Sequence, residues 1–163
     1  MTTKAFTKAV TEMVETLYRI SCAELSIEAD REDAVQETLR RAWEKRMSLK
    51  NDYYLHTWII RILINVCHDI QRERRRMIPV DVLPDFSDFT PSDYTPTDVI
   101  DLRDCLLRLK ERDRIPIILY YIEGYDIKQI AAILRIPQGT VKSRLNRGRK
   151  QLEIFCREEV FDI

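Results

Sequence analysis

The residues best suited to chemistry in this chain are the cations that follow residue 126. Between Ile127 and Leu152 there is no Asp or Glu, and seven Lys or Arg residues occur: Lys128, Arg135, Lys142, Arg144, Arg147, Arg149 and Lys150. The whole chain carries 27 basic and 27 acidic residues, so this excess is local. Uncompensated positive charge on one short segment is typical of a surface that binds a polyanion. The segment is predicted to contact nucleic acid, and the neutrality of the whole chain indicates that DNA affinity alone does not carry its function.

A helix-turn-helix is predicted to position these cations. Asp126 and Gln129 match a capping box that opens a helix over 127–134, and Pro137 breaks the chain before a second helix near Gln138. The inward stripe of the second helix is Val141, Leu145 and Leu152. In this motif the second helix enters the major groove. The side chains expected against DNA are Gln138, Thr140, Lys142, Ser143, Asn146 and Arg147, with Arg144, Arg149 and Lys150 on phosphates. The competing interpretation is a solvated basic helix face.

A segment rich in proline and aspartate divides the chain. Four of the six prolines fall between residues 77 and 97, and no Lys or Arg occurs between Arg76 and Arg103. Repeated proline cannot continue a helix, so this segment is predicted to be an extended acidic linker. Glycine is scarce and β-branched alternation is rare, which favours an all-α chain. The prediction is two small helical domains, over 1–76 and 98–163, joined by the linker over 77–97.

The first half shows three amphipathic patterns at helical spacing, from Phe6 to Ile20, Ala34 to Trp43 and Leu55 to Ile70. Three such helices can bury their apolar stripes against one another, so a three-helix-type bundle is predicted. In the second half, Gly124 is predicted to end an apolar segment that starts at Ile115, with Pro116 in its first turn.

Two polar surfaces of the first half could have a function. One is a stripe at helical spacing, which taken alone is typical of a solvent-facing helix: Asp33, Gln36, Glu37 and Arg40. The other joins the loop Lys50-Asn-Asp-Tyr-Tyr54 to a third helix whose outward residues include Arg61, Asn65, His68 or Asp69, and Arg72. Aromatic rings beside cations suit single-stranded DNA, because the rings stack on unpaired bases. The alternative is that Tyr53 and Tyr54 close the core and the arginines end an ordinary helix.

Several function classes are disfavoured by composition. The four cysteines are scattered, and the two histidines, His56 and His68, show no metal-ligand spacing. No cofactor, metal or small-molecule substrate is therefore expected. No apolar run reaches 18 residues, and the N-terminus lacks the charged and then apolar segments of a signal peptide. A cytoplasmic location without membrane insertion is therefore expected.

Two separate motifs resemble one known family. Asp33-Ala-Val-Gln-Glu-Thr38 with Arg41-Ala-Trp43, and Trp58-Ile-Ile-Arg-Ile-Leu-Ile-Asn65, resemble region 2 of bacterial RNA polymerase sigma factors. Gly139-Thr-Val-Lys-Ser-Arg-Leu145, with the preceding helix, resembles region 4. The likeness runs from about Leu17 to Leu152 in the expected order, and the lack of a further domain resembles the extracytoplasmic-function (ECF) subfamily.

The resemblance implies a non-enzymatic transcription initiation factor that binds bacterial core RNA polymerase, through the β′ clamp helices and β flap, and promoter DNA. An anti-sigma factor is an expected further partner. The residues implied at the clamp helices are Asp33, Gln36, Glu37 and Arg40. Those implied at the −10 element are Lys50, Asn51, Tyr53, Tyr54, Trp58, Arg61, Asn65 and Arg72. Those implied at the −35 element are Gln138, Thr140, Lys142, Ser143, Arg144, Asn146, Arg147 and Lys150.

Three alternatives remain open at this stage. The first is a stand-alone helix-turn-helix regulator, which would bind duplex DNA without polymerase. The second is a small nuclease or recombinase, which would need clustered acids or a nucleophile beside a base. The third is a protein that mimics a sigma factor but cannot melt DNA. The sequence also departs from the family pattern at Leu39, Lys110 and Gly148, where Phe, Pro and Ala are frequent. Gly148 is expected to cost the helix about 1 kcal/mol.

Overall fold

The computed structural model describes residues 1–77 and 102–161, and every regular element within these ranges is helical. The predicted all-α fold class is confirmed. The predicted linker over 77–97 lies, apart from Met77, outside the described residues. No helix in the described part of the chain is both long enough and apolar enough to cross a membrane.

The N-terminal half contains four helices rather than the predicted three. They are α1 (Thr3–Glu12), α2 (Val14–Glu24), α3 (Glu28–Glu44) and α4 (Leu55–Met77). The pattern from Phe6 to Ile20 was predicted as one helix, but Met13 separates α1 from α2 with φ −88° and ψ −8°. The apolar spacing continues through this break because Met13 itself is buried, 4% exposed.

The long helix α4 forms the centre of this half. Its fully buried side chains include Ile59, Ile60 and Leu63, against which α2 and α3 pack. The chain passes from α3 to α4 through two short 3-10 turns, Arg46–Ser48 and Asp52–Tyr54. Arg31 joins α3 to the end of α2 by donating hydrogen bonds to the carbonyls of Leu25 (2.8 Å) and Ser26 (3.1 Å).

The C-terminal half contains α5 (Leu102–Arg108), α6 (Glu111–Ile117), a π-helical turn over Ile118–Ile122, α7 (Ile127–Leu134) and α8 (Gln138–Phe161). Pro116 lies inside α6, so its predicted place in a first turn is wrong: the helix begins at Glu111. Pro116 has no N–H for the carbonyl of Arg112, and the chain widens into the π turn directly afterwards. As predicted, Gly124 follows this segment, with φ +77°.

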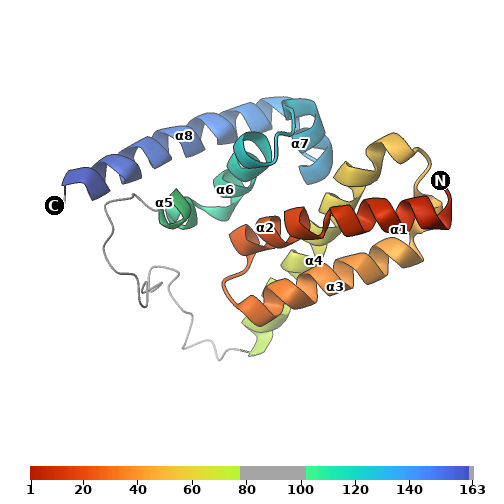
Figure 1. Ribbon diagram of the computed structural model, residues 1–163. Helices are drawn as coiled ribbons and strands as arrows, with labels where there is room; N and C mark the ends of the chain where they lie inside the picture. Colours follow the sequence, from red (N-terminus) through yellow and green to blue (C-terminus); the bar gives the residue numbers. More distant parts are fainter. Residues whose placement is uncertain (78–101, 162–163) are drawn as a thin grey trace.

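The two halves pack against each other. Helix α6 lies between α8 and α2, and α7 contacts α4 (Figure 1). One apolar core runs through both halves, from Leu17, Ile20 and Leu63 to Leu119 and Ile130. At the surface of this contact, the guanidinium of Arg19 donates to both carboxylate oxygens of Glu123, at 2.9 and 3.2 Å. The two sets of DNA-reading candidates are therefore parts of one packed body.

Candidate nucleic-acid interface

The helix-turn-helix forms as predicted, and local signals explain its boundaries. The Asp126 carboxylate accepts from the N–H of Gln129 at 2.7 Å, and the Gln129 side chain accepts from the N–H of Asp126 at 3.0 Å. Helix α7 ends at Leu134, and the following residue, Arg135, turns the chain with its left-handed φ of 55°. Val141 and Leu145 are buried, 0% and 4% exposed, and fix α8 against the core. The capping box and the start of α8 are confirmed.

Helix α8 presents most of its predicted DNA-facing side chains to solvent. Gln138, Lys142, Ser143, Asn146 and Lys150 are exposed, while Thr140 and Arg144 are half-buried. The Ser143 hydroxyl donates to the carbonyl of Thr140 at 3.0 Å, so its oxygen keeps acceptor capacity. Polar and cationic groups thus occupy one outer surface of the second helix.

Arg147 has a structural partner that the sequence does not reveal. Its guanidinium donates two hydrogen bonds to the carboxylate of Asp113 in α6, at 2.9 and 2.7 Å. The Asp113 side chain is 0% exposed and that of Arg147 is 44% exposed. The hydrogen bond to Asp113 is the first cause of the raised pKa of Arg147. This ion pair holds α6 to α8, so Arg147 positions the second helix of the helix-turn-helix in addition to any contact that it makes with DNA.

The tyrosine loop before α4 is open to solvent. Tyr53 and Tyr54 are 79% and 56% exposed, and their rings meet edge to face with centroids 5.1 Å apart. The side chain of Asn51 accepts from the N–H of Tyr53 at 2.9 Å and starts the short turn. The alternative in which these tyrosines close the core is wrong. Lys50 is exposed beside them, and Trp58 is half-buried in α4.

The other α4 candidates lie near the C-terminal half. The guanidinium of Arg61 donates to the carbonyl of Ala132 in α7, and burial, then the charge of Arg135, lowers the pKa of Arg61. Arg61 and Asn65 line a cavity of about 660 Å³ between the halves, together with Arg135 and Arg144. Arg72, one turn from the end of α4, is exposed and pairs with Asp69 at 2.8 Å. Residues predicted for the −10 element and for the −35 element therefore line the same cavity.

The polar stripe on α3 is an ionic network. Asp33 and Gln36 are exposed, while Glu37 accepts hydrogen bonds from Arg40 at 2.7 Å and from Arg41 at 2.7 Å. These two donors, Arg40 first, lower the pKa of Glu37 to about 2. Arg41 also donates to Asp69 of α4 at 2.9 Å, which links the stripe to the central helix.

Sequence reasoning missed the residues that join the halves. Arg19 and Glu123 are 104 positions apart, and the sequence carries no local signal that pairs them. It also missed that Glu24, His68 and Glu111 meet at the contact between the halves. These three residues belong to three different helices, so their spacing along the chain carries no motif.

The chain matches known proteins over both halves. The family described as sigma-70 region 2 matches residues 9–77, and that described as sigma-70, region 4 matches residues 100–152. The ECF RNA polymerase sigma factor EcfG of Rhodopseudomonas palustris is 34% identical over 132 residues, which cover 78% of this chain and 72% of EcfG. SigE of Mycolicibacterium smegmatis is 30% identical over 154 residues, 90% of this chain but only 59% of SigE.

Solved structures agree with these matches. The sigma factor RpoE from Bartonella quintana, solved in complex with the anti-sigma factor NepR, is similar with a TM-score of 0.77 at 28% identity, covering 94% of this chain and 98% of that one. CnrH, solved with the cytosolic domain of CnrY, is similar in fold with a TM-score of 0.70. The two regions match in the order that the sequence motifs predict. This chain belongs to the sigma-70 family of bacterial RNA polymerase sigma factors, in the ECF subfamily.

Proposed function

We propose that the two helical halves of this ECF sigma factor divide promoter recognition between them, and that the chain has no catalytic activity of its own. Core RNA polymerase supplies the active site in the cytoplasm, and this chain supplies promoter selection and melting. The proposed domains span residues 1–76 and 98–163. The neutral net charge supports a division in which the free chain binds DNA weakly and gains affinity when both readers are held on the polymerase.

The exposed surface of α8 is the observation that carries this proposal. Lys142, Ser143 and Asn146 lie outward on a helix whose start is fixed by a complete helix-turn-helix. Lys can bind guanine O6 or N7, and Ser and Asn can bind bases or phosphates. We assign the −35 element to this surface, with Gln138, Thr140, Arg144 and Lys150 at its edges and Arg147 as the residue that also fixes α8 to α6.

The tyrosine loop and α4 are assigned to the −10 element. Tyr53 and Tyr54 are exposed rings beside Lys50, and Trp58 follows within the next turn of α4. This combination supports stacking on unpaired bases with a cation near the backbone. Asn51, Arg61, Asn65 and Arg72 complete the surface. Arg61 bonds to the carbonyl of Ala132 in α7, so contact of its guanidinium with the −10 element requires this hydrogen bond to break.

Two further contacts follow from the family. The α3 stripe of Asp33, Gln36, Glu37 and Arg40 is proposed to dock on the β′ clamp helices, and the β flap is proposed to hold the C-terminal half. An anti-sigma factor is proposed as a regulator, by analogy with the relative RpoE, which was solved with NepR.

Promoter opening tests the proposal directly. Permanganate reactivity of unpaired thymines would be measured on a promoter library, with bacterial core polymerase, with this chain, and with both. Melting is expected only with both components. Lys142→Ala and Tyr53→Ala should each reduce it, while Lys4→Ala, which removes an exposed cation from α1, is the matched control.

The rival functions give different results. Tight duplex binding without core, and no melting with it, would establish a stand-alone regulator. Binding to core without melting on any promoter of the library would indicate a sigma mimic. Cleavage or strand exchange by the chain alone would overturn the non-enzymatic assignment.

A further inference from the structure

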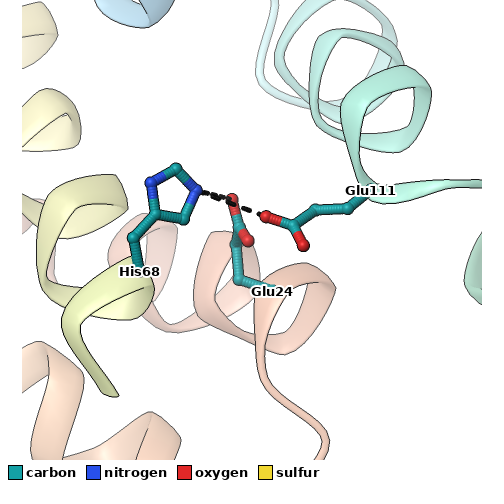
Figure 2. A group of neighbouring side chains, drawn as sticks. All are labelled: Glu24, His68 and Glu111. Carbon is teal, nitrogen blue, oxygen red and sulfur yellow. Dashed lines mark ion pairs between the residues drawn. The ribbon is translucent and has the colours of Figure 1, made fainter. Parts of the chain in front are cut away.

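Three side chains of metal-ligand type meet where the two halves of the protein pack together. Glu24 ends α2, His68 lies in α4 and Glu111 begins α6, and Figure 2 shows all three pointing toward one another. One ligand atom from each residue lies within 4.8 Å of the other two. The function proposed above gives this cluster no role.

The separations suit a small divalent cation. His68 Nε2 lies 3.3 Å from Glu111 Oε1 and 3.9 Å from Glu24 Oε1. Two ligand atoms that each lie about 2.0–2.1 Å from a tetrahedral Zn²⁺ are separated by about 3.3–3.4 Å. The pair His68–Glu111 already has this spacing, and the pair His68–Glu24 needs a movement of roughly half an ångström. The third pair, Glu24–Glu111, lies within 4.8 Å. The same imidazole nitrogen faces both carboxylates, so a single ion can reach all three groups.

The cluster also contains a buried acceptor without a partner. The Glu24 side chain is 1% exposed, and its Oε2 has no hydrogen-bond partner. A buried carboxylate is costly unless a cation, a donor or a proton satisfies it. The charge of Arg114 attracts both carboxylates, but its guanidinium donates its hydrogen bond to the carbonyl of Leu107 at 3.3 Å and not to Glu24 Oε2.

We propose that Glu24, His68 and Glu111 form a site for a divalent transition-metal ion of the Zn²⁺ type that ties α6 to α2 and α4. An imidazole with two carboxylates is a ligand set for such ions, and three protein ligands leave a fourth position for water. The three residues line the cavity of about 660 Å³ between the halves, which supplies a route of entry. Glu24 and His68 belong to the N-terminal half and Glu111 to the C-terminal half, so the bound ion cross-links the two halves. This cross-link is called the clasp below.

The charges around the cavity set the importance of each carboxylate. Lys110 and Arg112 line the same cavity, so they oppose an incoming cation. Arg61, Arg135 and Arg144 line it too, so Glu24 and Glu111 are two carboxylates among five cations, and losing either one removes half of the negative charge that attracts the ion. A change of Glu111 should therefore weaken binding as strongly as a change of His68.

Metal binding to the full chain is the experiment that tests the proposal. The chain would be stripped with a chelator, dialysed, and titrated with Zn²⁺ against a chromophoric competitor. One equivalent should bind, and His68→Asn and Glu111→Gln should each weaken binding at least about tenfold, since even supporting residues of metal sites change affinity by 10–100-fold. His56→Asn and Glu32→Gln, both exposed, are the matched controls and should bind as the unchanged chain does.

Two further measurements separate this site from thiol binding and from a site within one half. Cys105 and Cys156 have sulfur atoms 3.5 Å apart, so Cys156→Ser is titrated in parallel and the Co²⁺-loaded chain is inspected for thiolate charge-transfer absorption. Retained binding in Cys156→Ser, no thiolate band, and slower hydrogen exchange of α6 amides with Zn²⁺ would support the clasp. Loss of binding in Cys156→Ser, unchanged binding in Glu111→Gln, or no binding at all would overturn it.

Discussion

Arg147 of α8 is bound through two hydrogen bonds to the fully buried carboxylate of Asp113 in α6. The residue that the sequence places against DNA is therefore also the partner of a buried charge. Removing one member of such a pair leaves the other desolvated and unpaired, which destabilises a fold more than the pair itself stabilises it.

Arg147→Ala is expected to lower the melting temperature of the free chain, because Asp113 is left buried without its cation. Arg147→Lys keeps a positive charge but loses the bidentate hydrogen bonding, so its melting temperature should lie between those of the unchanged chain and Arg147→Ala. The double variant Arg147→Ala/Asp113→Ala removes both charges and should recover part of the loss. Thermal unfolding followed by circular dichroism measures all three. Equal melting temperatures for Arg147→Ala and the unchanged chain would show that the pair has no structural role.

Gly148→Ala is expected to destabilise the protein by up to about 2 kcal/mol despite the higher helix propensity of alanine. An added Cβ would lie 2.8 Å from Ile117 Cγ1, which is closer than real contacts allow. Overpacking costs about 1–3 kcal/mol, whereas replacing glycine in a helix gains about 1 kcal/mol.

Gly139→Ala is the matched control, because nothing lies within 4 Å of an added Cβ there. This variant should be neutral or stabilised by up to about 1 kcal/mol. Urea unfolding compares the two. A stabilised Gly148→Ala variant would show that α6 and α8 can separate slightly without loss.

Tyr53→Ala is expected to weaken promoter melting by roughly tenfold, since stacking on an unpaired base contributes about 1–3 kcal/mol. The chain offers a close control in Tyr121, another exposed tyrosine in an edge-to-face pair, with Tyr120 at 4.9 Å. Tyr121→Ala should leave melting unchanged. Permanganate footprints with core polymerase report the effect. Equal footprints for both variants would show that the tyrosine loop does not contact the −10 element.

The carboxyl group of Glu37 is expected to titrate near pH 2. Hydrogen bonds from Arg40 and Arg41 lower its pKa from 4.5 to about 2. The folded pKa lies below the unfolded one, so the stabilisation is present above about pH 4.5 and is lost as the pH falls toward 2. The side-chain carboxyl carbon can be followed by NMR. Arg41→Ala should return the midpoint toward 4.5, and an unchanged midpoint would contradict the assignment.

Reversing the charge of Arg19 is expected to loosen the two halves. Arg19→Glu places two carboxylates together, because the Glu123 side chain is only 5% exposed and faces it. The radius of gyration measured by small-angle X-ray scattering should increase. Arg19→Glu/Glu123→Arg restores opposite charges and should return it toward the original value. If the single variant scatters as the unchanged chain does, this pair does not hold the halves together.

Elements with local signals could be predicted from the sequence, and the packing between them could not. Asp126, Gln129 and Pro137 mark the helix-turn-helix by their own chemistry, so α7 and the start of α8 were predicted correctly. The break at Met13 was missed because the apolar spacing continues through it. Arg147 gave no sign of its partner because Asp113 is 34 positions away, and the ion pair forms only after α6 and α8 pack.

The cavity between the halves also bears on how salt acts on this protein. Four of the five cations that line it, Lys110, Arg112, Arg135 and Arg144, belong to the C-terminal half, and closing the halves brings Arg61 of α4 against them. Dissolved ions screen that repulsion over about 8 Å at physiological ionic strength. The same ions weaken binding to DNA phosphates. Rising ionic strength therefore screens both the repulsion of Arg61 and the attraction between Arg19 and Glu123, which oppose each other in the contact between the halves. Its effect on DNA contacts has one direction, so salt reduces promoter occupancy through the DNA-facing surfaces.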